Sequence, residues 1–169
     1  MKRSRTLNRR SVLSALAAAP LISCGRSEAE HRFLTPAEAR ALSAFCDRLI
    51  PPDGAPGASR AGVVHYIDIQ LTRRFKRFQP VYQTGLASLD DAARRGHGSA
   101  FAALDVAAQT ALLEAMEQGK DKPFFELVLA HTMQGFYGSP RHGGNRDGVS
   151  WTMLGVPNPP VRGRLHYEV

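Results

Sequence analysis

Apolar stripes at helical spacing, interrupted by proline and glycine, constrain the fold of this chain more than any other feature. Thr35 is a typical helix cap, Pro36 suits the first helical position, and Glu38 completes a capping box. Pro51-Pro52 then stops the stripe. The stripe itself consists of Leu42, Phe45, Leu49 and Ile50. We therefore predict a first helix that begins at Pro36 and ends before Pro51.

Four further helices are predicted downstream. A Gly/Pro loop over residues 53–59 leads to a second helix from about residue 60 to residue 75, with Gly62 inside it. Pro80 can open a third helix that Gly96 ends, Asp105 can cap a fourth, and Pro123 opens a fifth. The expected core positions are Val63, Ile67 and Leu71; Tyr82, Leu86, Leu89 and Ala93; Ala108, Leu112, Ala115 and Met116; and Phe124, Leu127, Val128 and His131.

The expected fold class is all-α. No alternating apolar pattern of convincing length indicates a strand, so we predict a small irregular bundle of about five helices. After Gly135 the chain becomes rich in glycine, and one short helix is expected over residues 149–154, around the single tryptophan, Trp151. Residues 155–169 hold three prolines and little periodicity, which predicts an extended tail. The helical domain is thus expected over residues 34–154.

The N-terminal segment has the pattern of a twin-arginine export signal. Arg9 and Arg10 precede a short apolar run over residues 12–22, and no acidic residue occurs before Glu28. The run is far below the roughly 20 residues needed to span a bilayer, so we expect no transmembrane helix there. The signal would direct the chain to the twin-arginine translocase. The alternative is an amphipathic basic helix that binds a membrane or nucleic acid.

Two processing sites compete at the end of this segment. Residues 21–24, Leu-Ile-Ser-Cys, resemble a lipoprotein box, in which Cys24 becomes the lipidated first residue of the mature chain. Residues 17–19, three alanines, have the small-residue pattern of simple cleavage, but Pro20 would follow the cut. An uncleaved anchor is the third alternative. We favour lipidation, which gives a signal peptide over residues 1–23, a tether over residues 24–33, and a periplasmic chain held at the membrane.

The charge of the chain resides mostly in this signal. The formal net charge is +7, and residues 1–23 carry five cations and no acid, which leaves +2 on residues 24–169. A domain so nearly balanced offers no general electrostatic reason to bind nucleic acid. Cys46 is the only cysteine left if Cys24 carries lipid, so no internal disulfide can form. We interpret Cys46 as a buried thiol; a disulfide to another subunit is the alternative.

Two segments of the chain carry a specific residue pattern. The first runs from Tyr137 to Asp147, YGSPRHGGNRD, and continues in WTMLG at residues 151–155 and in Pro157. The second comprises residues 34–36, 47–51, 57, 61–63 and 66–68. Together they resemble the gluconate 2-dehydrogenase subunit 3 family, over roughly residues 34–159. Cys24 departs from the family pattern, in which a lipoprotein box is not general.

The resemblance implies a non-catalytic role. In this family a large flavoprotein subunit holds the FAD and the sugar or sugar-acid substrate on the periplasmic side. The small subunit supplies the export signal and assists folding, and a multihaem cytochrome c subunit often completes the complex. We therefore expect the large subunit as partner, haem c in a third subunit, and no cofactor in this chain.

The Gly-rich segment is the predicted partner interface. Glycine and asparagine tolerate positive φ, and an asparagine amide can cap a turn, so a tight turn that holds Trp151 against the helices is one interpretation. The other is a preformed surface for the large subunit, because arginine and tryptophan are enriched at interface hot spots. Both can hold together. The candidate interface residues are Arg141, His142, Gly143, Gly144, Asn145, Arg146 and Trp151.

Residue patterns of catalysis are missing from the sequence. The six histidines form no pair at helical metal spacing, and there is no dinucleotide fingerprint, phosphate loop or haem-attachment motif. We interpret His131 as a packed core histidine. Two alternatives to an accessory subunit stay open: a stand-alone periplasmic lipoprotein adaptor or small-ligand binder, and, more remotely, a self-sufficient enzyme.

Overall fold

The computed structural model describes residues 31–157. The predicted export signal, the lipidation site Cys24 and most of the predicted C-terminal tail lie outside the described residues. Within them the chain forms six α-helices and no strand, which confirms the all-α prediction. Their bounds are α1 Pro36–Leu49, α2 Val63–Leu71, α3 Gln79–His97, α4 Val106–Gln118, α5 Lys122–Tyr137 and α6 Val149–Met153.

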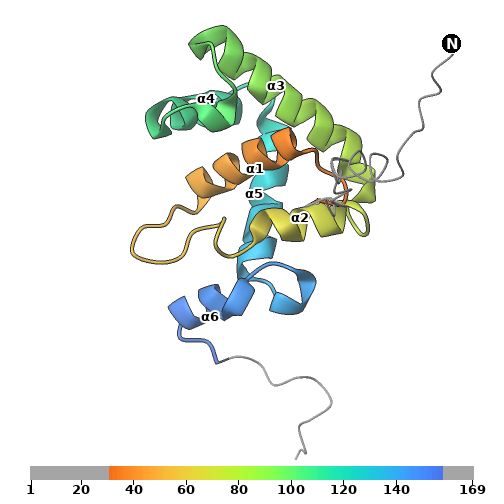
Figure 1. The fold of residues 1–169 in the computed structure, drawn as a ribbon, viewed down its shortest axis with the longest axis vertical. Coiled ribbons are helices and arrows are strands. Elements are labelled where there is room, and N and C mark those ends of the chain that lie inside the picture. Colours follow the sequence, from red (N-terminus) through yellow and green to blue (C-terminus); the bar gives the residue numbers. More distant parts are fainter. Residues whose placement is uncertain (1–30, 158–169) are drawn as a thin grey trace, which may run out of the picture.

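Helix α5 runs through the middle of the molecule and contacts each of the other five helices (Figure 1). Its buried side packs with aromatic contacts, since the Phe45 ring of α1 lies 6.3 Å from the Phe124 ring and 5.7 Å from the Phe125 ring. Helices α3 and α4 lie at one end of α5, and α6 lies at the other. The core therefore forms around a central helix rather than between equal layers.

Helix α1 begins as predicted. The Thr35 hydroxyl accepts a hydrogen bond from the Glu38 amide (3.3 Å), and the Thr35 amide donates to the Glu38 carboxylate (2.8 Å). Both halves of the capping box are therefore present. Leu42 and Phe45 are fully buried, and Leu49 and Ile50 are partly buried.

The bounds of α2 and α3 differ from the prediction. Helix α2 begins only at Val63, because Gly62 adopts a left-handed conformation (φ 73°) and forms the cap instead of an interior position. It ends at Leu71, and a turn follows. Helix α3 continues past Gly96 to His97, and the left-handed residue that ends it is Gly98 (φ 73°).

Helix α4 faces the core largely as predicted, with one exception. Asp105 caps it as expected, Met116 is buried, and Ala108 and Leu112 are half-buried, but Ala115 is exposed. Gln109 and Leu113 are buried in addition. Gln109 is drawn inward because its side-chain amide donates to the carbonyls of Phe101 (3.2 Å) and Leu104 (3.1 Å). In α5, Phe124, Val128 and His131 are buried as predicted, and Leu127 is half-buried.

Candidate partner interface

The Gly-rich segment after α5 folds back onto the start of α2. The Arg146 amide donates a hydrogen bond of 3.0 Å to the Ala61 carbonyl. The side chain of Arg146 then crosses Gly62, where an added Cβ atom would lie 2.5 Å from Arg146 Nε and 2.8 Å from Arg146 Cδ. Two segments far apart in the sequence therefore form one structural unit.

Asn145 holds this segment in shape. It adopts φ 44°, is completely buried, and donates from Nδ2 to the Gly138 carbonyl (2.9 Å). Its Oδ1 accepts a hydrogen bond from the Ser150 amide (3.0 Å), and Trp151 Nε1 donates to the Tyr137 carbonyl (3.0 Å). The side-chain amide thus joins the end of α5 to the start of α6, as the tight-turn interpretation requires.

The two glycines allow the backbone to approach its neighbours. A Cβ atom at Gly144 would collide with the Gly135 carbonyl oxygen of α5. Gly143 adopts φ 99°, and a Cβ atom there would lie 2.8 Å from Ile69 Cδ1 of α2. The double glycine is therefore explained by close packing against α5 and α2.

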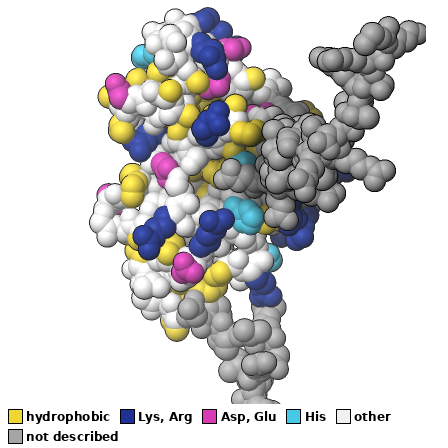
Figure 2. Space-filling model, in the orientation of Figure 1, with side chains coloured by type: hydrophobic (Ala, Val, Ile, Leu, Met, Phe, Trp, Pro, Cys, Tyr) yellow, Lys and Arg dark blue, Asp and Glu magenta, His cyan; other side chains and the backbone are white. Residues whose placement is uncertain are grey.

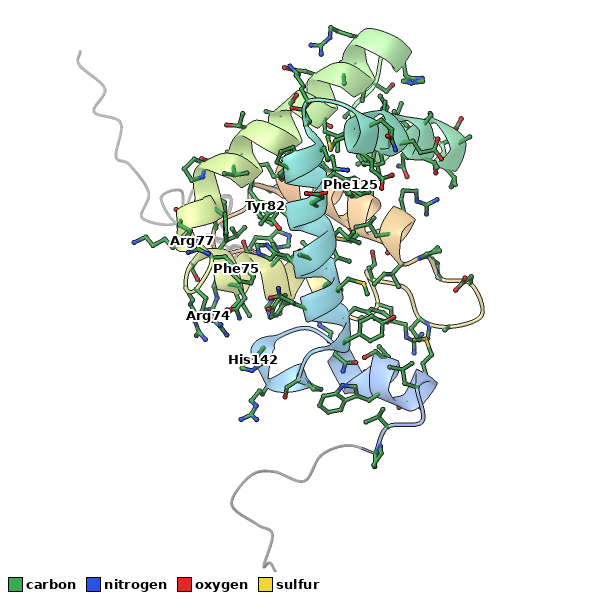
Figure 3. The ribbon with its side chains drawn as sticks, turned by 180° about the vertical axis from the view of Figure 1, so that it is seen from behind. Arg74, Phe75, Arg77, Tyr82, Phe125 and His142 are labelled. Carbon is green, nitrogen blue, oxygen red and sulfur yellow. The ribbon has the colours of Figure 1, made fainter. Side chains whose placement is uncertain are left out.

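The seven predicted interface residues divide by exposure. Arg141, His142 and Arg146 are exposed, Trp151 and Gly143 are half-buried, and Gly144 and Asn145 are buried. Over the face drawn in Figure 2, basic, acidic and apolar side chains are interspersed. Figure 3 shows the labelled His142 at the α6 end of the molecule, directed away from the core. The buried members can only support such a surface, whereas the exposed ones can contact a partner.

Exposed apolar side chains adjoin this segment. Leu154 is 56% exposed and Val156 46%, and the Val156 amide donates to the Trp151 carbonyl (2.8 Å). Met153 is also exposed, and it borders a shallow depression of about 340 Å³ between residues 54–56 and α6. We call Met153, Leu154 and Val156 the apolar end. Sequence reasoning treated Met153 and Leu154 as motif positions only and did not single out Val156; the apolar character of all three residues around Gly155 was the available signal.

Asp68 of α2 is a second feature that sequence reasoning missed. The side chain is 1% exposed, and its carboxylate accepts hydrogen bonds from three consecutive amides, those of Arg32 (2.6 Å), Phe33 (2.9 Å) and Leu34 (2.9 Å). This arrangement fixes the chain immediately before α1 against α2. An acidic residue among the apolar positions of the predicted second helix was the signal.

His65 lies beneath the Gly-rich segment. A Cβ atom at Gly143 would lie 3.2 Å from its Cδ2 atom. Burial lowers the pKa of His65, and the positive charge of Arg146 lowers it further, while Asp68 opposes both. Burial first, and then the charge of the arginine that covers Gly62, therefore favour the neutral form of His65.

The other singled-out side chains are packed in the core. His131 stacks on the Phe75 ring at 3.8 Å, and its Nδ1 and the Tyr82 hydroxyl form a hydrogen bond of 2.9 Å. Burial lowers the pKa of His131 to about 4. Cys46 is fully buried with its Sγ 3.2 Å from Thr132 Oγ1, and burial raises its pKa to about 12. These positions favour the inert-thiol interpretation of Cys46 over a disulfide to another subunit, which would need an accessible sulfur.

Metal-binding clusters and membrane-spanning helices are both missing from the described part of the chain. No group of three or more histidine, cysteine, aspartate or glutamate side chains is placed to hold a metal ion among residues 31–157. Over the same range, none of the helices has the length and apolar character that crossing a bilayer requires.

A family model described as gluconate 2-dehydrogenase subunit 3 matches residues 36–157. No curated protein and no solved structure matches the chain. The matched range includes Gly62, Arg146 and the apolar end. It therefore covers the start of α2, the Gly-rich segment and the exposed apolar residues beside it.

Proposed function

The chain belongs to the gluconate 2-dehydrogenase subunit 3 family, and on this premise we propose that it is a non-catalytic subunit of a membrane-associated, periplasm-facing flavin-dependent dehydrogenase. In this proposal the large subunit holds FAD and oxidises the sugar or sugar acid, and a multihaem cytochrome c subunit receives the electrons. The small subunit brings the export signal and helps the large subunit to fold.

One observation carries the proposal of an assembly role. Residues 137–151 contain several side-chain to backbone hydrogen bonds and closely packed glycines. The exposed side chains of the apolar end lie directly beside them. A rigid surface with exposed apolar side chains is the arrangement that a protein partner can bury at low cost in conformational entropy. We therefore assign the contact with the large subunit to Arg141, His142, Arg146, Trp151 and the apolar end.

Export is tested with the twin arginines. Arg9→Lys with Arg10→Lys should leave both this chain and a large subunit that lacks its own signal in the cytoplasm. Arg3→Lys with Arg5→Lys is the matched control, since it alters the same basic segment outside the pair. Fractionation followed by immunoblotting measures both subunits. Normal periplasmic levels of the large subunit in the Arg9/Arg10 variant would disprove its export with this chain.

Anchoring is tested separately. If Cys24 is lipidated, mass spectrometry of the mature N-terminus should find a lipid on residue 24, and Cys24→Ala should abolish the modification. An unmodified terminus at any other residue would reject lipidation and leave the subunit role untouched.

A further inference from the structure

The connection between α2 and α3 carries a concentrated positive charge. Arg73, Arg74, Lys76 and Arg77, which we call the basic corner, supply four cations within five positions. All four are exposed, and none forms a salt bridge with an acid among the described residues. Arg77 instead lies 4.7 Å above the Phe78 ring. These charges are therefore available to a partner outside the described chain.

The two aromatic residues of this segment hold the cations outward. Phe75 stacks on His131 at 3.8 Å, and the Phe78 ring lies 5.5 Å from the same imidazole. The Phe75 amide also donates to the Gln70 carbonyl (2.8 Å). Figure 3 shows Phe75 directed toward Tyr82 and α5, with Arg74 and Arg77 directed away from the core. The packing of these two rings therefore fixes the backbone that carries the four cations.

The chain enters the domain beside this corner. The Asp68 carboxylate binds the amides of residues 32–34, and the corner begins five residues after Asp68, just beyond the end of α2. Figure 1 shows the segment that leads into α1 passing near the connection between α2 and α3. Cys24 precedes Arg32 by eight residues, and eight residues span at most about 28 Å. A lipid on Cys24 would therefore keep the corner close to the bilayer surface.

We propose that the basic corner contacts anionic lipid headgroups and orients the domain on the membrane. This inference takes its geometry from the lipid anchor of the proposed function. Exposed lysine and arginine side chains near a bilayer are attracted to anionic headgroups, so a basic patch beside an anchored chain can orient it. The corner would face the membrane, which leaves the apolar end, on the α6 side of the molecule, open to the large subunit.

Vesicle binding by the full chain tests this proposal. All proteins carry Cys24→Ala, so no lipid contributes, and binding to phosphatidylcholine vesicles with and without phosphatidylglycerol is measured by cosedimentation. The corner variant is Arg73→Gln, Arg74→Gln, Lys76→Gln and Arg77→Gln. The charge-matched control is Arg60→Gln, Arg94→Gln, Arg95→Gln and Lys120→Gln, four exposed cations elsewhere on the surface. The corner variant and the control both keep residues 1–30. The difference in vesicle binding between these two proteins therefore reports on the corner alone.

The corner variant should bind phosphatidylglycerol vesicles at least tenfold more weakly, and the control within about threefold of the unaltered chain. Arg73→Lys with Arg74→Lys and Arg77→Lys should bind normally, because the charge is retained. Circular dichroism verifies that each variant is folded.

Equal losses of vesicle binding in the corner variant and the control, or no loss in the corner variant, would overturn the proposal. Loss of large-subunit capture with unchanged vesicle binding would also overturn it, by making the corner a protein interface. Failure of the subunit proposal would not alter these vesicle measurements, because no partner is present.

Discussion

The side chain of Arg146 lies across the backbone of Gly62, and a Cβ atom at residue 62 would come within 2.5 Å of Arg146 Nε. Gly62 also adopts φ 73°. This one contact therefore depends on glycine in two ways, through backbone conformation and through space. It also joins the start of α2 to the Gly-rich segment that we assign to partner binding.

Replacing Gly62 separates these two requirements. Gly98 has the same φ of 73°, but an added Cβ atom there would meet no atom within 4 Å, so Gly98→Ala should cost only the left-handed strain of about 1–2 kcal/mol. Gly62→Ala should cost about 1 kcal/mol more, because Arg146 must also move. Adding Arg146→Ala should remove that excess. Chemical denaturation measures the unaltered chain, Gly98→Ala, Gly62→Ala, Arg146→Ala and the Gly62→Ala/Arg146→Ala double variant. Equal costs at the two glycines, with no coupling to Arg146, would contradict the contact.

Asn145 offers a test of the turn itself. If its amide is essential, Asn145→Gly should destabilise the fold by about 2–4 kcal/mol despite relieving the positive φ, because the Gly138 carbonyl and the Ser150 amide lose their partner. Asn145→Ala should be at least as harmful. Thermal unfolding provides the measurement. A neutral Asn145→Gly would mean that the positive φ alone explains this asparagine.

The sequence allowed local features to be predicted but not contacts between distant segments. The capping box of Thr35 and Glu38 and the turn around Asn145 depend on neighbours within a few positions, and both were predicted. The Arg146–Gly62 contact and the Asp68 hydrogen bonds join residues more than thirty positions apart, and no spacing rule within one sequence specifies such pairs. Gln109 was missed for a different reason, because its burial depends on hydrogen bonds to the Phe101 and Leu104 carbonyls, which an apolar stripe does not reveal.

His131 predicts how stability depends on pH. Its pKa in the folded chain is about 4, below the ordinary value of 6.5, so the folded state resists protonation. Stability is complete above pH 6.5 and falls as the pH drops toward 4, because the unfolded chain takes up a proton that the folded chain does not. The loss should be about 2–3 kcal/mol. His131→Gln should flatten this dependence, and His65→Gln should flatten it less. Denaturation midpoints between pH 4 and pH 7 measure it; an unchanged slope in His131→Gln would contradict the assignment.

Capture of the large flavoprotein subunit is the decisive measurement for the subunit role. The tagged chain is coexpressed with that subunit, and Leu154→Asp with Val156→Asp is compared with Val81→Asp and Val106→Asp. Both pairs replace exposed valine or leucine, and the control positions lie in the first turns of α3 and α4, where aspartate is favoured. We predict that the unaltered chain and the control capture an FAD-containing partner, and that the apolar-end variant loses at least tenfold in capture while its melting temperature is unchanged. Equal capture by both variants, or a chain that purifies without any flavoprotein, would contradict the proposed role.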